Sequence, residues 1–158
     1  MPVVMSNGFI ARGGRWVVGQ FLLLCAIAIL GITCQAAPKS LPMDFCGSAF
    51  FVVSAICGLS GTLALGGNLT PFPRPNATAL LVQHGIYARI RHPLYTAVFC
   101  AVVGWSLVWQ SWPALACSLA LGVFFDAKAR REETWLREKF PEYPDYERRV
   151  RRFIPWIY

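Results

Sequence analysis

The sequence predicts an all-α integral membrane protein with about four transmembrane helices, a long cytoplasmic loop and a C-terminal amphipathic helix. Hydrophobic residues make up 56% of the chain and charged residues only 15%, a composition typical of membrane proteins. The formal net charge is +7, and nine of the fifteen Lys and Arg residues follow Asp126, so the positive charge is concentrated in the tail. A length of 158 residues indicates one domain, 1–158.

Four apolar segments account for the predicted spans. Segments 16–36 and 45–65 contain no charged residue and are close to the ~20 residues that cross the hydrocarbon core of a bilayer. Segments 94–109 and 112–125 are shorter, and only Gln110 and Ser111 separate them. We therefore expect the last two segments to form a tight helical hairpin.

The distribution of basic residues predicts the orientation. Arg12 and Arg15 precede the first span, three arginines lie between the second and third spans, and the basic tail follows the fourth. Because Lys and Arg favour cytoplasmic loops, we expect both termini in the cytoplasm. An alternative is that Arg12, Arg15, the apolar run and the CQAA sequence form a secretory signal with its cleavage site.

Two other segments are expected to fold at the membrane surface. The connection 66–92 contains Pro71, Pro73 and Pro75 and then an apolar stretch, which favours a segment folded back to line a site over a loop lying at the interface. The fourth helix is expected to continue through Phe140. A last helix over 145–153 would place Tyr146, Val150 and Phe153 on one apolar stripe against the lipid headgroups.

The cysteines and the basic charge do not indicate a metal or nucleic-acid site. Five of the six cysteines lie within apolar runs, there is no C-x-x-C motif, and neither His84 nor His92 has a thiol at zinc-ligand spacing. Packing is the simpler role for such cysteines. No nucleic-acid recognition module accompanies the basic tail, so nucleic acid is not an expected partner.

One group of motifs is more specific than the composition. Residues 85–95 read GIYARIRHPLY, an EETWL motif begins at Glu132, and an aromatic-rich tail runs from Tyr143 to Pro155. In this order and spacing, over about 66–155, they resemble the isoprenylcysteine carboxyl methyltransferase family and the related phospholipid N-methyltransferases. Each motif alone also has a simpler explanation. The acidic pair fits a solvated helix face, and R-H-P fits a proline that starts a helix after positive charge on the cytoplasmic side. The short chain suggests a bacterial member, located in the inner membrane.

The resemblance implies S-adenosylmethionine as cofactor, bound by regions 66–95 and 126–155. Glu132 matches the cofactor-binding first acid of the E-E pair. Lys128 lies four positions before it, where the prenylcysteine enzymes carry a substrate-contacting Arg. Lys128 (substrate orientation) is therefore an expected catalytic residue, and Arg91 of the R-H-P motif is the other. The expected cofactor contacts are Leu80, Leu81, Val82, Gly85, Tyr87, His92, Pro93, Leu94, Tyr95, Glu132, Glu133 and Tyr146.

The expected reaction is methyl transfer to a lipophilic acceptor at the cytoplasmic membrane face. A prenylcysteine-like carboxylate is favoured because a carboxylate is already ionised at neutral pH and needs no general base. The alternatives are a phospholipid or small-amine N-methyltransferase, an NADPH-dependent membrane reductase, and a non-enzymatic membrane accessory protein. The expected partners are a lipid-like substrate and the membrane lipids.

Overall fold

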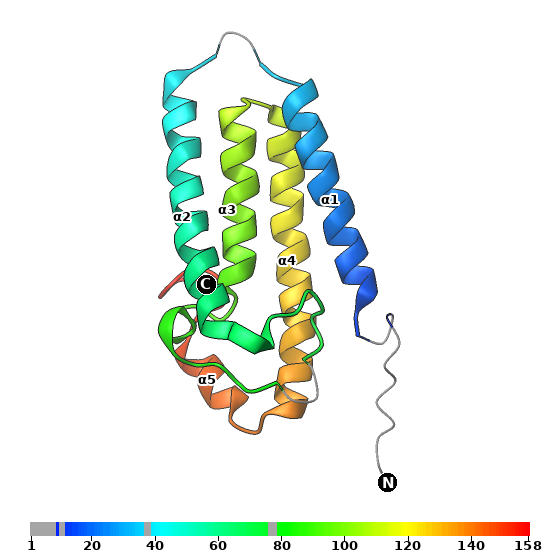
Figure 1. Ribbon diagram of the computed structural model, residues 1–158, viewed down its shortest axis with the longest axis vertical. Helices are drawn as coiled ribbons and strands as arrows, with labels where there is room; N and C mark the ends of the chain where they lie inside the picture. Colours follow the sequence, from blue (N-terminus) through cyan, green and yellow to red (C-terminus); the bar gives the residue numbers. More distant parts are fainter. Residues whose placement is uncertain (1–8, 10–11, 37–38, 76–78) are drawn as a thin grey trace.

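Four helices lie side by side in the computed structural model, which describes Phe9, 12–36, 39–75 and 79–158 (Figure 1). Position 37 of the possible cleavage signal and positions 76–78 of the expected loop lie outside the described residues. The predicted all-α architecture is confirmed. The bundle helices are α1 (Gly14–Thr33), α2 (Leu41–Leu65), α3 (Pro93–Val108) and α4 (Trp112–Lys139); the shorter elements are η1 (Gly66–Asn68), η2 (Gly85–Ala88) and α5 (Tyr143–Arg149).

Three of the four bundle helices are long and apolar enough to cross a membrane. They are α1, α2 extended by η1, and α4. The fourth, α3, has 16 residues, and at about 1.5 Å per residue it is shorter than the hydrocarbon core. Three predicted spans are therefore supported by helix length and composition, whereas the predicted span 94–109 is a shorter apolar helix between α2 and α4 (Figure 1).

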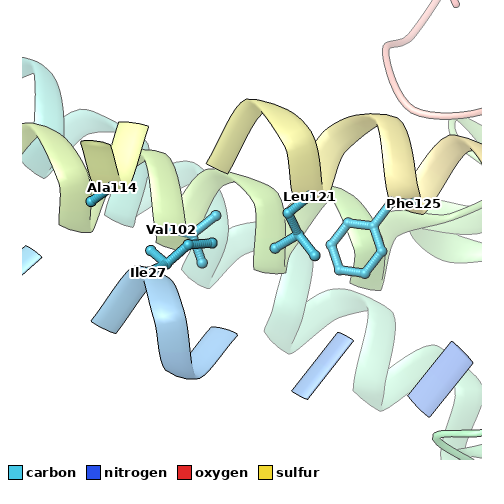
Figure 2. Packing of buried hydrophobic residues seen from close by; sticks show 5 residues of the cluster. All are labelled: Ile27, Val102, Ala114, Leu121 and Phe125. Atoms are coloured by element: carbon cyan, nitrogen blue, oxygen red, sulfur yellow. The ribbon is translucent and has the colours of Figure 1, made fainter. Parts of the chain in front are cut away.

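Helices α2 and α3 come close together where Gly47 faces Gly104. A Cβ atom added at Gly47 would lie 2.8 Å from the carbonyl oxygen of Gly104, so a side chain there would force the helices apart. On the other flank, α1 packs against α4. Ile27 of α1 meets Val102 of α3 and Leu121 of α4 in a cluster of buried side chains (Figure 2). Tight packing of this kind fixes the position of α4 relative to the other three helices.

At the end of the bundle away from α5, Gln110 joins the α3–α4 turn to the α1–α2 connection by hydrogen bonds. It is a non-glycine residue in the left-handed region, with φ 51. Its side chain donates to the carbonyl oxygen of Ser40 at 3.0 Å and accepts from the backbone N–H of Ser40 at 2.7 Å. Ser111 then caps α4 by accepting from the N–H of Ala114 at 3.4 Å. The Gln110 amide also donates to the Asp44 carboxylate at 3.2 Å, so one side chain holds this end by several hydrogen bonds.

The opposite end holds α5, the segment between α2 and α3, and the C-terminal extension of α4 (Figure 1). The helix predicted over 145–153 is wrong in its bounds, because α5 is Tyr143–Arg149. At Val150 the backbone becomes extended, with φ −117 and ψ 135. The N–H groups of Arg91 and His92 donate to the carbonyl oxygens of Arg151 and Arg152 at 2.9 and 3.0 Å. This pairing with a distant segment ends the helix.

The apolar stripe expected on the last helix turns into the protein. Tyr146 and Val150 are buried together with Tyr143. Phe153 lies against the ring of His92, with the centroids 5.8 Å apart. The tail helix therefore closes the end of the bundle instead of laying these residues on headgroups.

Candidate functional site

A pocket lies at this end of the bundle, between the segment that follows α2, the start of α3, the end of α4, and α5. Regions 66–95 and 126–155 both contribute to it. Ten residues predicted for the site line this pocket: Leu80, Leu81, Val82, Tyr87, Arg91, His92, Leu94, Tyr95, Glu132 and Tyr146.

Four other predicted residues do not line the pocket. Gly85 begins η2 with φ 61, and Pro93 is buried in the first turn of α3. Glu133 is buried on another face of α4, and Lys128 is buried one turn before Glu132. The structure therefore brings the two predicted regions together but divides the predicted residues between the pocket and its surroundings.

His92 and Pro93 begin α3 as the sequence indicates. His92 is the N-cap residue, with φ −125 and ψ 59, and Pro93 is in the first turn, where its missing N–H leaves no helical hydrogen bond unmade. At this break the N–H of His92 donates to the carbonyl oxygen of Arg152 at 3.0 Å, and its own carbonyl oxygen accepts from the N–H of Thr96 at 3.1 Å.

Glu132 faces the pocket. Its side chain is 25% exposed, and its Oε2 accepts a hydrogen bond from the Tyr95 hydroxyl at 2.6 Å. The Tyr95 ring stacks on His92, with centroids 5.3 Å apart, and on Phe125 at 5.0 Å. The stack fixes the phenol and so holds the Glu132 carboxylate, which keeps capacity to accept from an occupant.

Glu133 is the centre of a buried ion cluster formed with Arg91, His92 and Arg152. Its side chain is 0% exposed. Arg91 contacts Oε1 at 2.9 Å, His92 Nε2 lies 3.1 Å from Oε1, and Arg152 donates to both oxygens at 3.0 and 2.7 Å. This cluster ties the loop before α3, helix α4 and the tail to one carboxylate, because a buried charge is stable only when paired and hydrogen-bonded.

The Arg91 guanidinium has few donors to spare for a ligand. One terminal nitrogen donates to the carbonyl oxygens of Glu147 and Val150 at 2.8 and 3.1 Å, and the other contacts Glu133. Nε also donates to Glu133 at 3.1 Å. Arg91 therefore lines the pocket while its charged head is bound by protein groups.

Lys128 is 2% exposed and lies on the α1 side of α4. Its Nζ donates to Gln20 Oε1 at 2.6 Å and lies 5.0 Å from the centroid of the Tyr95 ring. Gln20 is a polar residue within the apolar run of α1, and no motif singled it out in the sequence.

Tyrosines form the α5 wall of the pocket. The Tyr146 hydroxyl donates to the carbonyl oxygen of Tyr87 at 2.7 Å. Burial, with a smaller contribution from nearby negative charge, raises the pKa of Tyr87. Burial likewise raises the pKa of Tyr146, so both phenols stay protonated at neutral pH. Tyr143 also lines the pocket, and its buried hydroxyl has no hydrogen-bond partner among the residues that the structure describes.

Several lining residues were not predicted individually. They are Leu65 at the end of α2; Asn68, Thr70, Phe72, Pro73, Pro75 and Ala79 from the connection after it; and Leu136, Phe140 and Tyr143 from the end of α4 and from α5. Their regions were expected to bind the cofactor, but only the apolar residues after the prolines gave a local indication. Asn68 has a visible role, since its side chain accepts from the N–H of Leu80 at 3.2 Å and folds the connection back.

No group of three or more His, Cys, Asp or Glu side chains that could hold a metal ion occurs in the part of the chain that the structure describes. The pocket lining offers the Glu132 carboxylate, the His92 imidazole, phenols, small polar side chains and apolar walls.

Comparison with known proteins identifies the family. The family model described as phospholipid methyltransferase matches residues 43–143, which include α2, α3 and α4. The chain belongs to the phospholipid methyltransferase family. The resemblance to the isoprenylcysteine enzymes and their phospholipid-modifying relatives is thereby confirmed.

Curated relatives match about half of this family member. It is 38% identical over 76 residues to the nickel-cobalt-cadmium resistance protein NccN of Alcaligenes xylosoxydans xylosoxydans, covering 48% of this chain and 36% of the relative. It is 36% identical over 84 residues to the protein-S-isoprenylcysteine O-methyltransferase of Schizosaccharomyces pombe, covering 52% of this chain and 36% of that protein. The chain thus spans about a third of the length of these relatives.

A solved structure shares the fold of this phospholipid methyltransferase family member. It is the eukaryotic intramembrane Ras methyltransferase ICMT, with a TM-score of 0.66 and 22% sequence identity. The match covers 92% of this chain and 53% of the ICMT chain. The bundle and its pocket-end segments therefore follow an architecture known from an intramembrane methyltransferase.

Proposed function

We propose that this protein transfers a methyl group from S-adenosylmethionine to a lipophilic acceptor, with a carboxylate as the favoured acceptor group. The observation that supports this most strongly is the pocket itself. It gathers ten residues predicted from the methyltransferase motifs, although these come from segments about fifty residues apart, and it exposes Glu132 while Glu133 is enclosed.

The pocket residues fit the chemistry of this cofactor. Glu132 can accept from an ammonium or a ribose hydroxyl, and the buried Tyr143 hydroxyl needs a partner that an occupant can supply. Leu81 and Val82 provide apolar wall against a purine base. When bound, S-adenosylmethionine supplies an electrophilic methyl group on a sulfonium.

We assign Glu133 and Arg91 to positioning. Glu133 holds the imidazole of His92 at 3.1 Å, the His92 ring stacks on Tyr95, and the Tyr95 hydroxyl holds Glu132. The ion cluster thus holds His92, His92 holds Tyr95, and Tyr95 holds the exposed Glu132 carboxylate in place. Such prior ordering lowers the entropic cost of bringing reactants into line.

Lys128 is the residue we assign to acceptor orientation. Its hydrogen bond goes to the neutral amide of Gln20, and its anionic neighbour is Glu132, one turn along α4. An acceptor carboxylate nearby would add a direct ion pair to this buried cation. No proton must leave a carboxylate before it attacks a methyl group. A surrounding with little water then favours a reaction in which opposite charges neutralise each other.

We further propose that the pocket end faces the cytoplasm of a bacterial cell, with α3 crossing the inner membrane beside α2 and α4. The long helices carry their Arg and Lys residues at the pocket end, as in the tail beyond Asp126, and this bias marks the cytoplasmic side. In this arrangement both termini are cytoplasmic, and 1–158 acts as one methyltransferase unit.

The test pairs cofactor binding with methyl transfer. Calorimetry on the purified protein should show S-adenosylmethionine binding, and methyl-labelled cofactor should label a prenylcysteine analogue. Lys128→Ala should keep the cofactor affinity and lose transfer to the carboxylate. Arg131→Ala, an exposed basic residue on the same helix, is the matched control and should keep both. Absence of cofactor binding to the intact protein would overturn the proposal.

The phospholipid methyltransferase family model favours a second acceptor, a phospholipid amine. The same labelling assay with phosphatidylethanolamine vesicles separates the two. Label in the phospholipid and none in the prenylcysteine analogue would identify the phospholipid amine as the methyl acceptor. Binding of NADPH in place of S-adenosylmethionine would assign a reductase.

A further inference from the structure

A cleft lies beside the buried ion cluster, between α5 and the segment 153–158, which we call the tail turn. The cleft has a volume of about 160 Å³. Its lining residues are three arginines, one acid, one tyrosine and two aliphatic residues: Arg91, Arg151, Arg152, Glu147, Tyr158, Val150 and Ile157. Neither the methyltransferase motifs nor the proposed reaction gives this cleft a role.

Arg151 is the arginine of the cleft that is available to an incoming anion. Its side chain is exposed, and no described residue accepts a hydrogen bond from its guanidinium. Arg91 and Arg152, by contrast, are held by the Glu133 carboxylate at 2.9 and 2.7 Å. A free guanidinium can grip a phosphate through two parallel N–H···O bonds, so Arg151 supplies the recognition group of a phosphate site.

Positive side chains outnumber acidic ones around the cleft. The residues of the cleft and the ionised side chains that they contact include five arginines and three acids: Arg91, Arg130, Arg137, Arg151 and Arg152, with Asp126, Glu133 and Glu147. This surplus attracts an anion and repels a cation.

The depth of the cleft matches that of lipid headgroups. Asp126 is the first charged residue of α4, so the apolar part of that helix ends there. Two cleft residues bind its carboxylate, Arg152 at 2.8 Å and Tyr158 at 2.9 Å. With α4 spanning a bilayer, the lipid phosphates lie just outside the hydrocarbon core, at about this level.

The tail turn exposes apolar side chains next to the cleft. Trp156 is 81% exposed and Ile157 is 76% exposed. The turn is closed because the N–H groups of Phe153 and Ile154 donate to the main-chain oxygen of Tyr158 at 2.7 and 2.8 Å. Trp156 has φ 62, a conformation that a bulky residue keeps only when its surroundings hold it. Tryptophan is typical of the membrane–water interface, so the turn offers a fixed apolar surface to lipid chains.

We propose that this cleft binds the phosphate of an anionic phospholipid, with Arg151 as the main ligand and the tail turn against the acyl chains. The proposal goes beyond the proposed function and does not depend on it. The unpaired guanidinium, the surplus of arginines, the depth of the cleft and the exposed Trp156 and Ile157 carry it. Free phosphate would meet the same arginine but would gain nothing from the tail turn.

The experiment is native mass spectrometry on the purified full chain in detergent, which measures the apparent Kd of the first bound lipid. The probes are phosphatidylglycerol and phosphatidylcholine with the same acyl chains. We expect phosphatidylglycerol to bind several-fold more tightly, and Arg151→Gln should remove most of this preference. Arg148→Gln is the matched control, since Arg148 is an exposed arginine of α5 that pairs with Asp145 and does not line the cleft. It should keep the preference.

Two further measurements separate a lipid from free phosphate. Inorganic phosphate should displace phosphatidylglycerol no better than chloride at the same ionic strength, and Trp156→Ser should weaken phosphatidylglycerol binding several-fold. Displacement by phosphate alone, together with unchanged lipid binding in Trp156→Ser, would overturn the lipid as the occupant.

Two other results would also overturn the proposal. One is equal affinity of the unmodified chain for the two lipids, a measurement that needs no variant to fold. The other is an equal loss of preference in Arg151→Gln and Arg148→Gln, because it would show a diffuse effect of positive charge. Equal unfolding midpoints of these two variants check that neither change acts through the fold.

Discussion

Glu132 and Glu133 are neighbours in the chain, but they face two different regions of the molecule. Glu132 lies in the pocket, where its side chain is 25% exposed and has the Tyr95 hydroxyl as its hydrogen-bond donor. Glu133 is 0% exposed and is surrounded by Arg91, Arg152 and an imidazole. Adjacent residues of a helix point about 100° apart. Helix α4 therefore presents Glu132 to the pocket on one face and Glu133 to the buried ion cluster on another.

The largest effect should come from the enclosed carboxylate. Glu133→Gln removes the enclosed carboxylate that Arg91 and Arg152 share, and breaking such a buried pair costs about 3–5 kcal/mol. Arg152 keeps Asp126 at 2.8 Å and Arg91 keeps Glu147 at 3.6 Å, so the loss should lie at the lower end of this range. We expect a strongly lowered unfolding midpoint in detergent and early proteolysis of the tail. Glu132→Gln is the control and should leave both nearly unchanged. Equal destabilisation by the two variants would show that the two faces do not differ in this way.

The next effect concerns cofactor binding. Glu132→Gln removes a charged acceptor from the pocket wall, and the loss of such a contact costs about 1.5–3 kcal/mol, or one to two decades in affinity. Calorimetry with S-adenosylmethionine measures it. An unchanged affinity would remove Glu132 from the proposed cofactor site.

A smaller effect should follow from Tyr95→Phe. This change keeps the ring between His92 and Phe125 and removes only the hydroxyl that donates to Glu132 at 2.6 Å. We expect cofactor affinity to fall by about 0.5–1.5 kcal/mol, less than in Glu132→Gln. A larger loss in Tyr95→Phe would mean that the phenol itself binds the cofactor.

The smallest effect should come from the exposed pair beside the cluster. Arg137 donates to Glu147 at 2.9 and 2.7 Å, but its side chain is 43% exposed. Exposed pairs contribute about 0.2–1 kcal/mol and are weakened by salt. Arg137→Ala should therefore shift the unfolding midpoint slightly at low salt and less at high salt. Arg137 also lies 3.9 Å from Glu133, and a shift as large as that of Glu133→Gln would mean that this longer contact contributes as much as the buried ones.

Local patterns were sufficient to predict much of the fold. The break at His92–Pro93 follows from the chemistry of proline, and the extent of α4 follows from its uninterrupted helical pattern. The end of α5 could not be predicted in the same way. It depends on the pairing of Arg151 with Ile90, a contact between distant segments, which no local periodicity contains.

The candidate site was also predictable only in part, because some of its contacts join distant segments of the chain. The motifs identified the two segments that form the pocket, and Glu132 among its residues. They did not separate pocket residues from cluster residues, because the difference between Glu132 and Glu133 depends on where Arg152 of the tail folds. Gln20 was not foreseen, since its contact with Lys128 joins helices 108 positions apart. The roles of all these residues stay predictions until the variants are measured.

Tyr95 lines two pockets, the one that contains Glu132 and a second one walled by Phe99 and Phe125, so binding in one can affect binding in the other. Its hydroxyl is bound to Glu132 in one pocket and its ring lines the other. An occupant that shifts this side chain on one side changes the wall presented to the other side. Coupling free energies are reciprocal, so the factor by which one ligand alters the affinity of the second is also the factor by which the second alters the first. One aromatic residue can thus make two chemically different ligands sense each other without touching.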